Sequence, residues 1–146
     1  MSSDLGAPPA VTRRLGYLLK HAQLRLAELA EPLYAPLGIT GRQLALLTLF
    51  GEGPALSQQD GAARLGVDRT TMVALVDELE ARGLVRREVA PGDRRKRLVR
   101  LTGEGERVRE AGEEVTRQAE TLLLAPLSAE DAQGLRAALG RIVRGG

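Results

Sequence analysis

The feature that most restricts what this chain can fold into is the stretch from Leu56 to Thr102, in which helix-capping and turn-forming residues follow one another at short intervals. Ser57 and Asp68 are good N-cap residues, and Gly66 is a good stop for a helix that lies between them. We therefore expect one helix from Gln58 to Leu65 and a second that starts directly after Asp68. Two helices this short and this close, joined by a turn that contains glycine, are typical of a helix-turn-helix unit.

The second of these helices has one apolar face and one face that is open to a partner. Apolar residues recur at the spacing i, i+3, i+4, i+7 of a single buried stripe, and they are Met72, Leu75, Val76 and Leu79. The opposite side carries Thr70, Val73, Ala74 and Asp77, with Arg69 and Thr71 flanking it near the start of the helix. A helix of this kind can lie in the major groove of duplex DNA, which is wide enough to admit it.

A β-hairpin, or wing, is predicted next, around the turn-forming sequence Ala90-Pro91-Gly92-Asp93. Its β-type apolar residues are Leu84, Val85, Val89, Leu98, Val99 and Leu101. Between Val85 and Leu101 stand seven basic and two acidic residues, a net charge of +5 in a chain whose total is +2. The basic set is Arg86, Arg87, Arg94, Arg95, Lys96, Arg97 and Arg100. Positive charge is therefore concentrated where a hairpin would present it to phosphates.

Three runs in this stretch carry a resemblance to a known family. They are Leu79-Glu80-Ala81-Arg82-Gly83-Leu84-Val85-Arg86-Arg87, then Asp93-Arg94-Arg95, then Leu98-Val99-Arg100-Leu101-Thr102. In these runs the chain resembles the recognition helix, wing and exit of the MarR family of bacterial transcriptional regulators. The similarity extends from about Arg13 to Val143, and it includes Thr40-Gly41-Arg42-Gln43, where the family often has Thr-Pro-x-Gln. The wing is the specific part of the resemblance.

The resemblance implies a mainly α fold with a small β-wing, in a single domain over residues 1–146. The winged helix-turn-helix head would occupy residues 51–102, and residues 10–50 and 103–144 would supply the dimerisation and supporting helices. The implied function is a sequence-specific regulator, more often a repressor, that binds an inverted-repeat operator in double-stranded DNA as a homodimer. Two recognition helices related by a twofold axis would meet major grooves about 34 Å apart, with half-sites roughly 10 bp apart.

The residues expected to contact DNA lie at two helix starts and in the wing. They are Ser57, Gln58, Arg69, Thr70, Thr71, Val73, Ala74, Asp93, Arg94, Arg95, Lys96 and Arg97. By the family's Asp-x-Arg motif, Arg95 would enter the minor groove, whose narrow A·T tracts have the most negative potential. Asp93 would hold the hairpin in shape, and the other basic residues of the tip would contact phosphates.

Two alternatives and one departure from the family accompany this prediction. Thr70 and Thr71 could support the helix cap alone, and the basic residues could be a solvated surface run. Many family members carry a hydroxyl or a charged side chain at the positions of Val73 and Ala74. Two apolar side chains can pack against a thymine methyl but cannot hydrogen-bond base edges, so we expect direct base readout to be thin.

The flanking segments read as helices. From Ala10 to about Ala30 a stripe of leucines and alanine is accompanied by a second apolar surface, which we interpret as a dimer contact; the alternative is a simply buried helix. Pro32, Pro36 and Gly38 are expected to end it. Further helices are predicted over residues 40–50, from Thr102 to about Leu124 and over residues 128–143, with a short strand at residues 55–56 and a mobile tail at residues 1–9.

Composition excludes several classes of protein. The absence of cysteine removes disulfides, thiolate metal sites and thiol redox sensing, and the single histidine is too little for the usual zinc sets. We found no phosphate-binding glycine loop and no nucleophile elbow, so an enzyme is not expected, nor a cofactor. No apolar run approaches the roughly 20 residues of a membrane span, and the first residues lack the features of a secretory signal. A soluble, cytoplasmic protein is expected.

Many MarR-type regulators respond to small phenolic or anionic compounds bound between the dimer helices and the head. In this chain the polar candidates for such a site are Tyr17, His21, Arg25, Arg42 and Gln43. The first three are spaced i, i+4, i+8 and share a strip, which could equally be an interface or a satisfied polar edge. Because fold alone does not fix function, the rival reading is a winged-helix module that binds protein or RNA rather than operator DNA.

Overall fold

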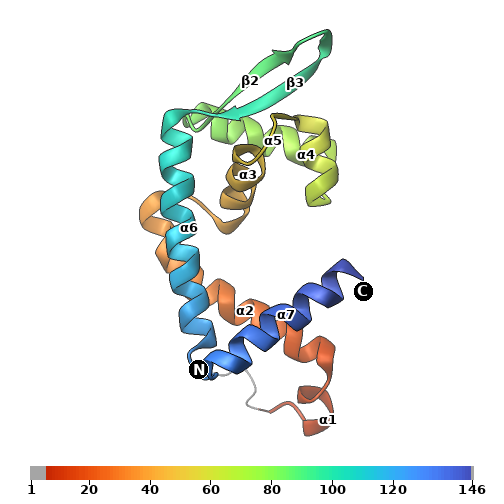
Figure 1. Cartoon of the computed structure of the whole chain (residues 1–146), viewed down its shortest axis with the longest axis vertical. Coiled ribbons are helices and arrows are strands. Elements are labelled where there is room, and N and C mark those ends of the chain that lie inside the picture. Colours follow the sequence, from red (N-terminus) through yellow and green to blue (C-terminus); the bar gives the residue numbers. More distant parts are fainter. Residues whose placement is uncertain (1–5, 146) are drawn as a thin grey trace. The chain divides into compact units, whose positions relative to one another are not determined.

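A computed structural model describes residues 6–145, and the chain forms two compact units (Figure 1). One unit combines Met1–Ala30 with Arg117–Gly146, and the other is Glu31–Thr116. We call them the terminal unit and the head. Most of the tail predicted at residues 1–9 lies outside the described residues.

The head contains three helices whose starts are fixed by polar side chains. They are α3 (Gly41–Gly51), α4 (Gln58–Leu65) and α5 (Arg69–Ala81). Thr40 and Gln43 form a reciprocal capping box, while the side chains of Ser57 and Asp68 accept from backbone N–H groups of the first turns of α4 and α5. These caps confirm the predicted starts. A 3₁₀ turn, η1 (Ala35–Leu37), precedes α3.

Three antiparallel strands complete the head in the order β1-β3-β2. They are β1 (Leu56–Ser57), β2 (Val85–Ala90) and β3 (Asp93–Leu101), and Figure 1 shows β2 and β3 extending as a hairpin beyond the helices of the head. The pairs Val85↔Leu101 and Arg87↔Val99 set the register, which shifts at Ala90 beside the turn. Gly92 has φ of 79°, a left-handed conformation that suits glycine in this tight turn. The predicted wing is confirmed.

An aliphatic core holds the helices of the head to the base of the hairpin. Its fully buried large side chains are Leu46, Leu47, Met72, Val76, Leu79, Val85 and Val99, with Leu75 packed partly against them. The predicted stripe of the second helix is therefore the buried face of α5. A further close contact lies at Gly105 in α6 (Gly103–Leu124), where a Cβ atom would collide with the Leu84 carbonyl oxygen. Only glycine lets α6 begin this close to the backbone at Leu84.

The first predicted helix differs from the structure at both ends. It is split into α1 (Pro9–Thr12) and α2 (Leu15–Tyr34), and α2 continues through Pro32. The sequence predicts that the helix runs to about Ala30 and breaks at Pro32, Pro36 and Gly38, but α2 continues through Pro32 to Tyr34, so Pro32 does not end it although it lacks an N–H donor. Pro36 does lie in the break, within η1. The left-handed Gly38, with φ of 69°, provides the actual stop after η1.

The terminal unit buries few of its apolar side chains. Among its described residues, the buried hydrophobic ones are Ala30 and Ala119. Helix α7 (Ala129–Arg144), capped by Ser128 as predicted, leaves Ile142 63% and Val143 84% exposed. Other exposed large apolar residues of this unit are Val11, Leu15, Leu18, Leu19, Leu24, Leu122, Leu127 and Leu135. Within residues 6–145, the helices are too short or too polar to cross a membrane.

Candidate nucleic-acid interface

The outward side of α5 carries the residues predicted to face DNA. Arg69, Thr70, Val73 and Ala74 are all exposed there. Thr71 is half-buried, and both its backbone N–H and its hydroxyl donate to the Asp68 carboxylate, at 2.7 and 2.9 Å. These two bonds lower the pKa of Asp68 from its ordinary value. Thr71 therefore supports the cap, which leaves Thr70 as the exposed hydroxyl of this pair.

The start of α4 lies against the start of α5. Ser57 is buried, and its hydroxyl accepts from the Asp60 N–H at 3.0 Å, so its side chain is used as a cap. Gln58, Gln59, Arg69 and Met72 line a small hollow of about 40 Å³ between the two helix starts. The unpaired N–H groups of a helix start carry partial positive charge, so this corner combines a helix dipole with the guanidinium of Arg69.

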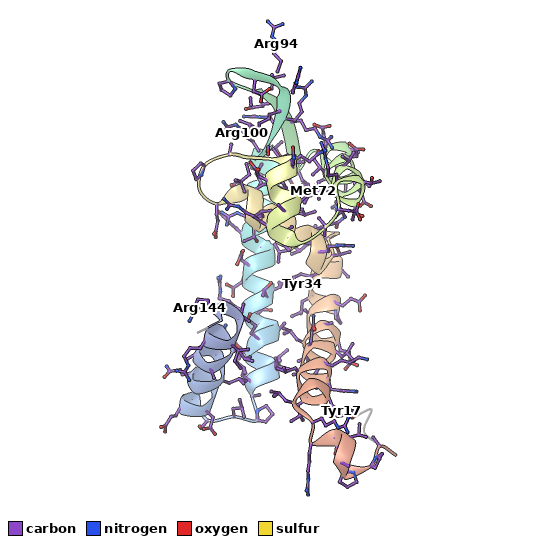
Figure 2. The ribbon with its side chains drawn as sticks, turned by 90° about the vertical axis from the view of Figure 1, so that its right-hand side faces the viewer. Tyr17, Tyr34, Met72, Arg94, Arg100 and Arg144 are labelled. Atoms are coloured by element: carbon purple, nitrogen blue, oxygen red, sulfur yellow. The ribbon has the colours of Figure 1, made fainter. Side chains whose placement is uncertain are left out.

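The tip of the wing is an exposed basic loop held in shape by one carboxylate. Arg94, Arg95, Lys96 and Arg97 are exposed, and Figure 2 shows Arg94 pointing away from the ribbon at the end of the hairpin. The Asp93 carboxylate accepts from the Arg95 N–H at 3.0 Å, which is the shaping role expected for Asp93. The Arg97 guanidinium donates to the Arg94 carbonyl at 2.9 Å. The geometry therefore presents cations at the far end of the wing.

Nearer the base of the wing, two of the counted arginines are already paired. Glu88 accepts from Arg100 at 2.6 Å and from Arg86 at 2.9 Å. The hydrogen bond from Arg100 is the main reason why the pKa of Glu88 lies below its ordinary value, and the bond from Arg86 adds to it. The charge count of the sequence did not separate these side chains from those of the tip.

A third arginine of the basic set, Arg87, points toward the helices. Its side chain is 18% exposed and forms ion pairs with Asp77 and Glu80 of α5. Its Nε donates to the amide oxygen of Gln58 at 2.9 Å, so this oxygen of Gln58 is used in a contact within the head. The sequence held a signal for this: Arg87 is two residues after Val85, and residues two apart in a strand face the same side.

The five predicted ligand residues belong to different units. In the terminal unit the rings of Tyr17 and His21 stack at 4.0 Å, and the buried Tyr17 hydroxyl has no hydrogen-bond partner among the described residues. Arg25 forms an exposed ion pair with Glu28 at 3.6 Å. In the head, Arg42 is exposed and Gln43 is buried in the capping box of α3. A role for these residues in ligand binding stays a prediction.

Comparison with known proteins gives consistent matches. A family model described as the MarR family matches residues 37–96. The HTH-type transcriptional repressor NicR of Pseudomonas putida is 33% identical over 123 residues, which cover 84% of this chain and 77% of that protein. The chain spans 55% to 77% of the length of the first curated relatives that it matches.

Solved structures match over nearly the whole chain. The transcriptional repressor CouR bound to a 23-mer DNA duplex has a TM-score of 0.86 and 32% identity, and the match covers 92% of this chain and 96% of that one. CouR from Rhodococcus jostii RHA1 bound to p-coumaroyl-CoA has a TM-score of 0.78 and 29% identity, over 92% of this chain and 95% of that one.

Proposed function

Because the chain belongs to the MarR family of transcriptional regulators, we propose that it binds an inverted-repeat operator as a homodimer and regulates transcription, as a repressor. Helix α5 enters the major groove and the tip of the wing enters the minor groove. The observation that carries this proposal lies within the head: the exposed face of α5 and the exposed cations of residues 94–97 belong to one compact unit. Relatives of this chain are regulators and not enzymes, which supports a function without catalysis.

Base recognition in this proposal depends on few polar groups. Arg69 and Thr70 are the exposed side chains of α5 that can donate a hydrogen bond to a base edge or a phosphate. Val73 and Ala74 add apolar surface suited to a thymine methyl. Affinity then comes largely from phosphates, so log Kd should change with log salt by roughly 0.9 for each phosphate neutralised.

The exposed apolar side chains of the terminal unit support pairing of two copies. Ile142 and Val143 of α7 are largely exposed in the single chain, and large apolar side chains left exposed in such number fit an interface. A twofold dimer presents two heads to one inverted repeat, with half-sites roughly 10 bp apart.

Release by a small molecule is the second part of the proposal. A related regulator has been solved with p-coumaroyl-CoA, which is both phenolic and anionic. In this chain the unpartnered Tyr17 hydroxyl and the stacked His21 ring support an effector of the same chemical class. Such a protein would act in the cytoplasm, where its DNA is.

A salt series with duplex DNA tests the proposal. Duplex from upstream of the chain's own coding sequence should bind more tightly than an unrelated duplex, with Kd rising steeply as salt rises. Reversing charge at the tip with Arg95→Glu should weaken binding by about 10–100-fold, because a cation is lost and an anion is added beside phosphates. Dimer content and thermal midpoint should not change.

The matched control is Arg64→Glu, an equal charge reversal at an exposed position in the last turn of α4. It should affect binding far less than Arg95→Glu. Equal loss in both variants would show that only overall charge matters and would remove the role of the wing. Preference for RNA or for a protein partner over duplex DNA would favour the rival winged-helix function.

A further inference from the structure

The inward-facing Arg87 of β2 uses all three nitrogens of its guanidinium and its backbone N–H in contacts within the head. Its Nη2 lies 2.7 Å from the Asp77 carboxylate and 3.3 Å from the Val73 carbonyl oxygen, and its Nη1 lies 3.0 Å from Glu80. Its Nε reaches Gln58 at 2.9 Å, and its backbone N–H donates to the second Glu80 oxygen at 3.0 Å. One side chain thereby joins the wing to both helices of the helix-turn-helix.

The strand register explains why Arg87 turns inward while its neighbours do not. Arg87 pairs with the buried Val99 and shares a strand face with Val85, so both of its nearest apolar neighbours lie on the core side. Arg86 and Glu88 lie on the opposite face, where the Glu88 carboxylate forms ion pairs with both Arg86 and Arg100. The basic wing thus has an inner arginine and an outer set.

The partners of Arg87 on α5 follow one line along the helix. Val73, Asp77 and Glu80 are spaced i, i+4, i+7, so they share one helix face. Three contacts along such a line restrain both the rotation of α5 and its shift along its own axis. Val73 is also one of the exposed residues that would face the bases, so the restraint acts directly on the reading surface.

We propose that Arg87 is a positioning residue for DNA recognition. It fixes α5 and α4 relative to the wing and thereby sets sequence preference without contacting a phosphate. This inference rests on the proposed function. A planar guanidinium with five donors can hold four acceptors at once, whereas a lysine ammonium cannot reproduce that fork.

Substituting the acidic partners of Arg87 tests the proposal, because the direction of the change in Kd for operator DNA differs between two explanations. Asp77 and Glu80 lie on the helix that would enter the groove, so simple Coulomb repulsion from phosphates predicts that Asp77→Asn or Glu80→Gln tightens binding. If their main function is to hold Arg87, the same neutral substitutions loosen α5 and weaken binding to the operator. The two explanations give opposite changes in Kd.

The experiment measures Kd for operator duplex and for unrelated duplex over a salt series, in the full-length dimer. Arg87→Gln and Glu80→Gln should each weaken operator binding by about tenfold or more, since each removes charged hydrogen bonds. Binding to unrelated duplex should change far less, so the ratio of the two affinities falls. The salt slope should stay the same, because no phosphate contact is lost.

The matched control is Arg86→Gln, the adjacent arginine on the outer face of the wing. It removes the same charge and should leave the ratio of affinities intact. Arg87→Lys keeps the charge but not the fork and should also lower the ratio. Should Arg87→Gln fail to fold, as thermal unfolding would reveal, Arg87→Lys and Glu80→Gln carry the test.

Three results would overturn the inference. A salt slope reduced by roughly 0.9 with an unchanged ratio of affinities would make Arg87 a phosphate contact. Tighter operator binding by Glu80→Gln would show that repulsion outweighs positioning. Full rescue by Arg87→Lys would show that charge alone matters. If the unaltered protein shows no preference for its operator, the proposed function itself fails, which is a different outcome.

Discussion

The two units of the chain bury their apolar side chains to very different extents. The head has a closed core in which seven large side chains, among them Leu47 and Met72, are fully buried. The terminal unit buries only alanines among its described hydrophobic residues and exposes Leu15, Ile142 and Val143. Since burial of apolar surface is the main favourable term in folding, the head has the larger share of this stabilisation. The exposed apolar side chains of the terminal unit fit the pairing of two copies proposed above.

The largest expected effect comes from placing a charge in the exposed apolar face of the terminal unit. Ile142→Glu should raise the dimer dissociation constant at least about 100-fold. A twofold interface contains the change twice, and each lost burial costs about 1.5–3 kcal/mol. Sedimentation at several protein concentrations measures this. Val89→Glu, at an exposed apolar position of the wing, is the control and should leave the dimer intact.

A core substitution in the head should be costly in a different way. Leu47→Ala should lower the free energy of unfolding by about 2–5 kcal/mol, because a buried side chain is replaced by a cavity. The loss should not depend on protein concentration. For Leu122→Ala in the terminal unit, where the side chain is exposed, the shift in thermal midpoint should depend on concentration through the dimer. Identical concentration dependence for the two variants would abolish the distinction between the units.

Alanine substitutions at two glycines, one in each unit, should change the free energy of unfolding by smaller amounts and in opposite directions. Gly105→Ala in the head should cost about 1–3 kcal/mol, because its methyl group would overlap the Leu84 carbonyl. Gly134→Ala in α7 meets no atom within 4 Å and should stabilise by about 0.5–1 kcal/mol through helix propensity. Chemical denaturation measures both. A loss at Gly134 would indicate that a second copy packs closely against this point of α7.

The smallest expected effect is a pH dependence at the start of α5. The pKa of Asp68 is lowered by the N–H and hydroxyl of Thr71, so its stabilising contribution is present at neutral pH. It is lost as the pH falls below about 3.9, the ordinary aspartate value, and through the lowered folded pKa. Asp68→Asn keeps a cap but removes the titration. The thermal midpoint of the unaltered protein should therefore fall more steeply in acid than that of Asp68→Asn.

The sequence predicts the structure best where single residues dictate backbone geometry. The bounds of α4 and α5 match the structure because Ser57, Gly66 and Asp68 each define one helix end by a local hydrogen bond or a left-handed turn. The break before α2 has no such marker, and Pro32 alone does not mark a helix end, because α2 continues past it. Patterns locate helix faces better than they locate interruptions.

The functional residues show the limit of counting charges. The charge count treats the seven basic residues of the wing as one set facing phosphates. The structure divides them into the exposed tip, the two arginines paired with Glu88 and the inward Arg87. Alternation along β2 could have revealed the orientation of Arg87. Its partners Asp77 and Gln58 could not be deduced, because they depend on how helices pack against the sheet.

The proline inside α2 has a mechanical consequence. Pro32 has no N–H to donate to the carbonyl of Glu28, so α2 lacks one backbone hydrogen bond here. The missing bond spans the step from Ala30 of the terminal unit to Glu31 of the head. Backbone hydrogen bonds give a helix its bending stiffness, and kinks concentrate where one of them is missing. This step is therefore where α2 is expected to bend, and in the dimer proposed above it would let the chain adjust to the groove spacing of its DNA.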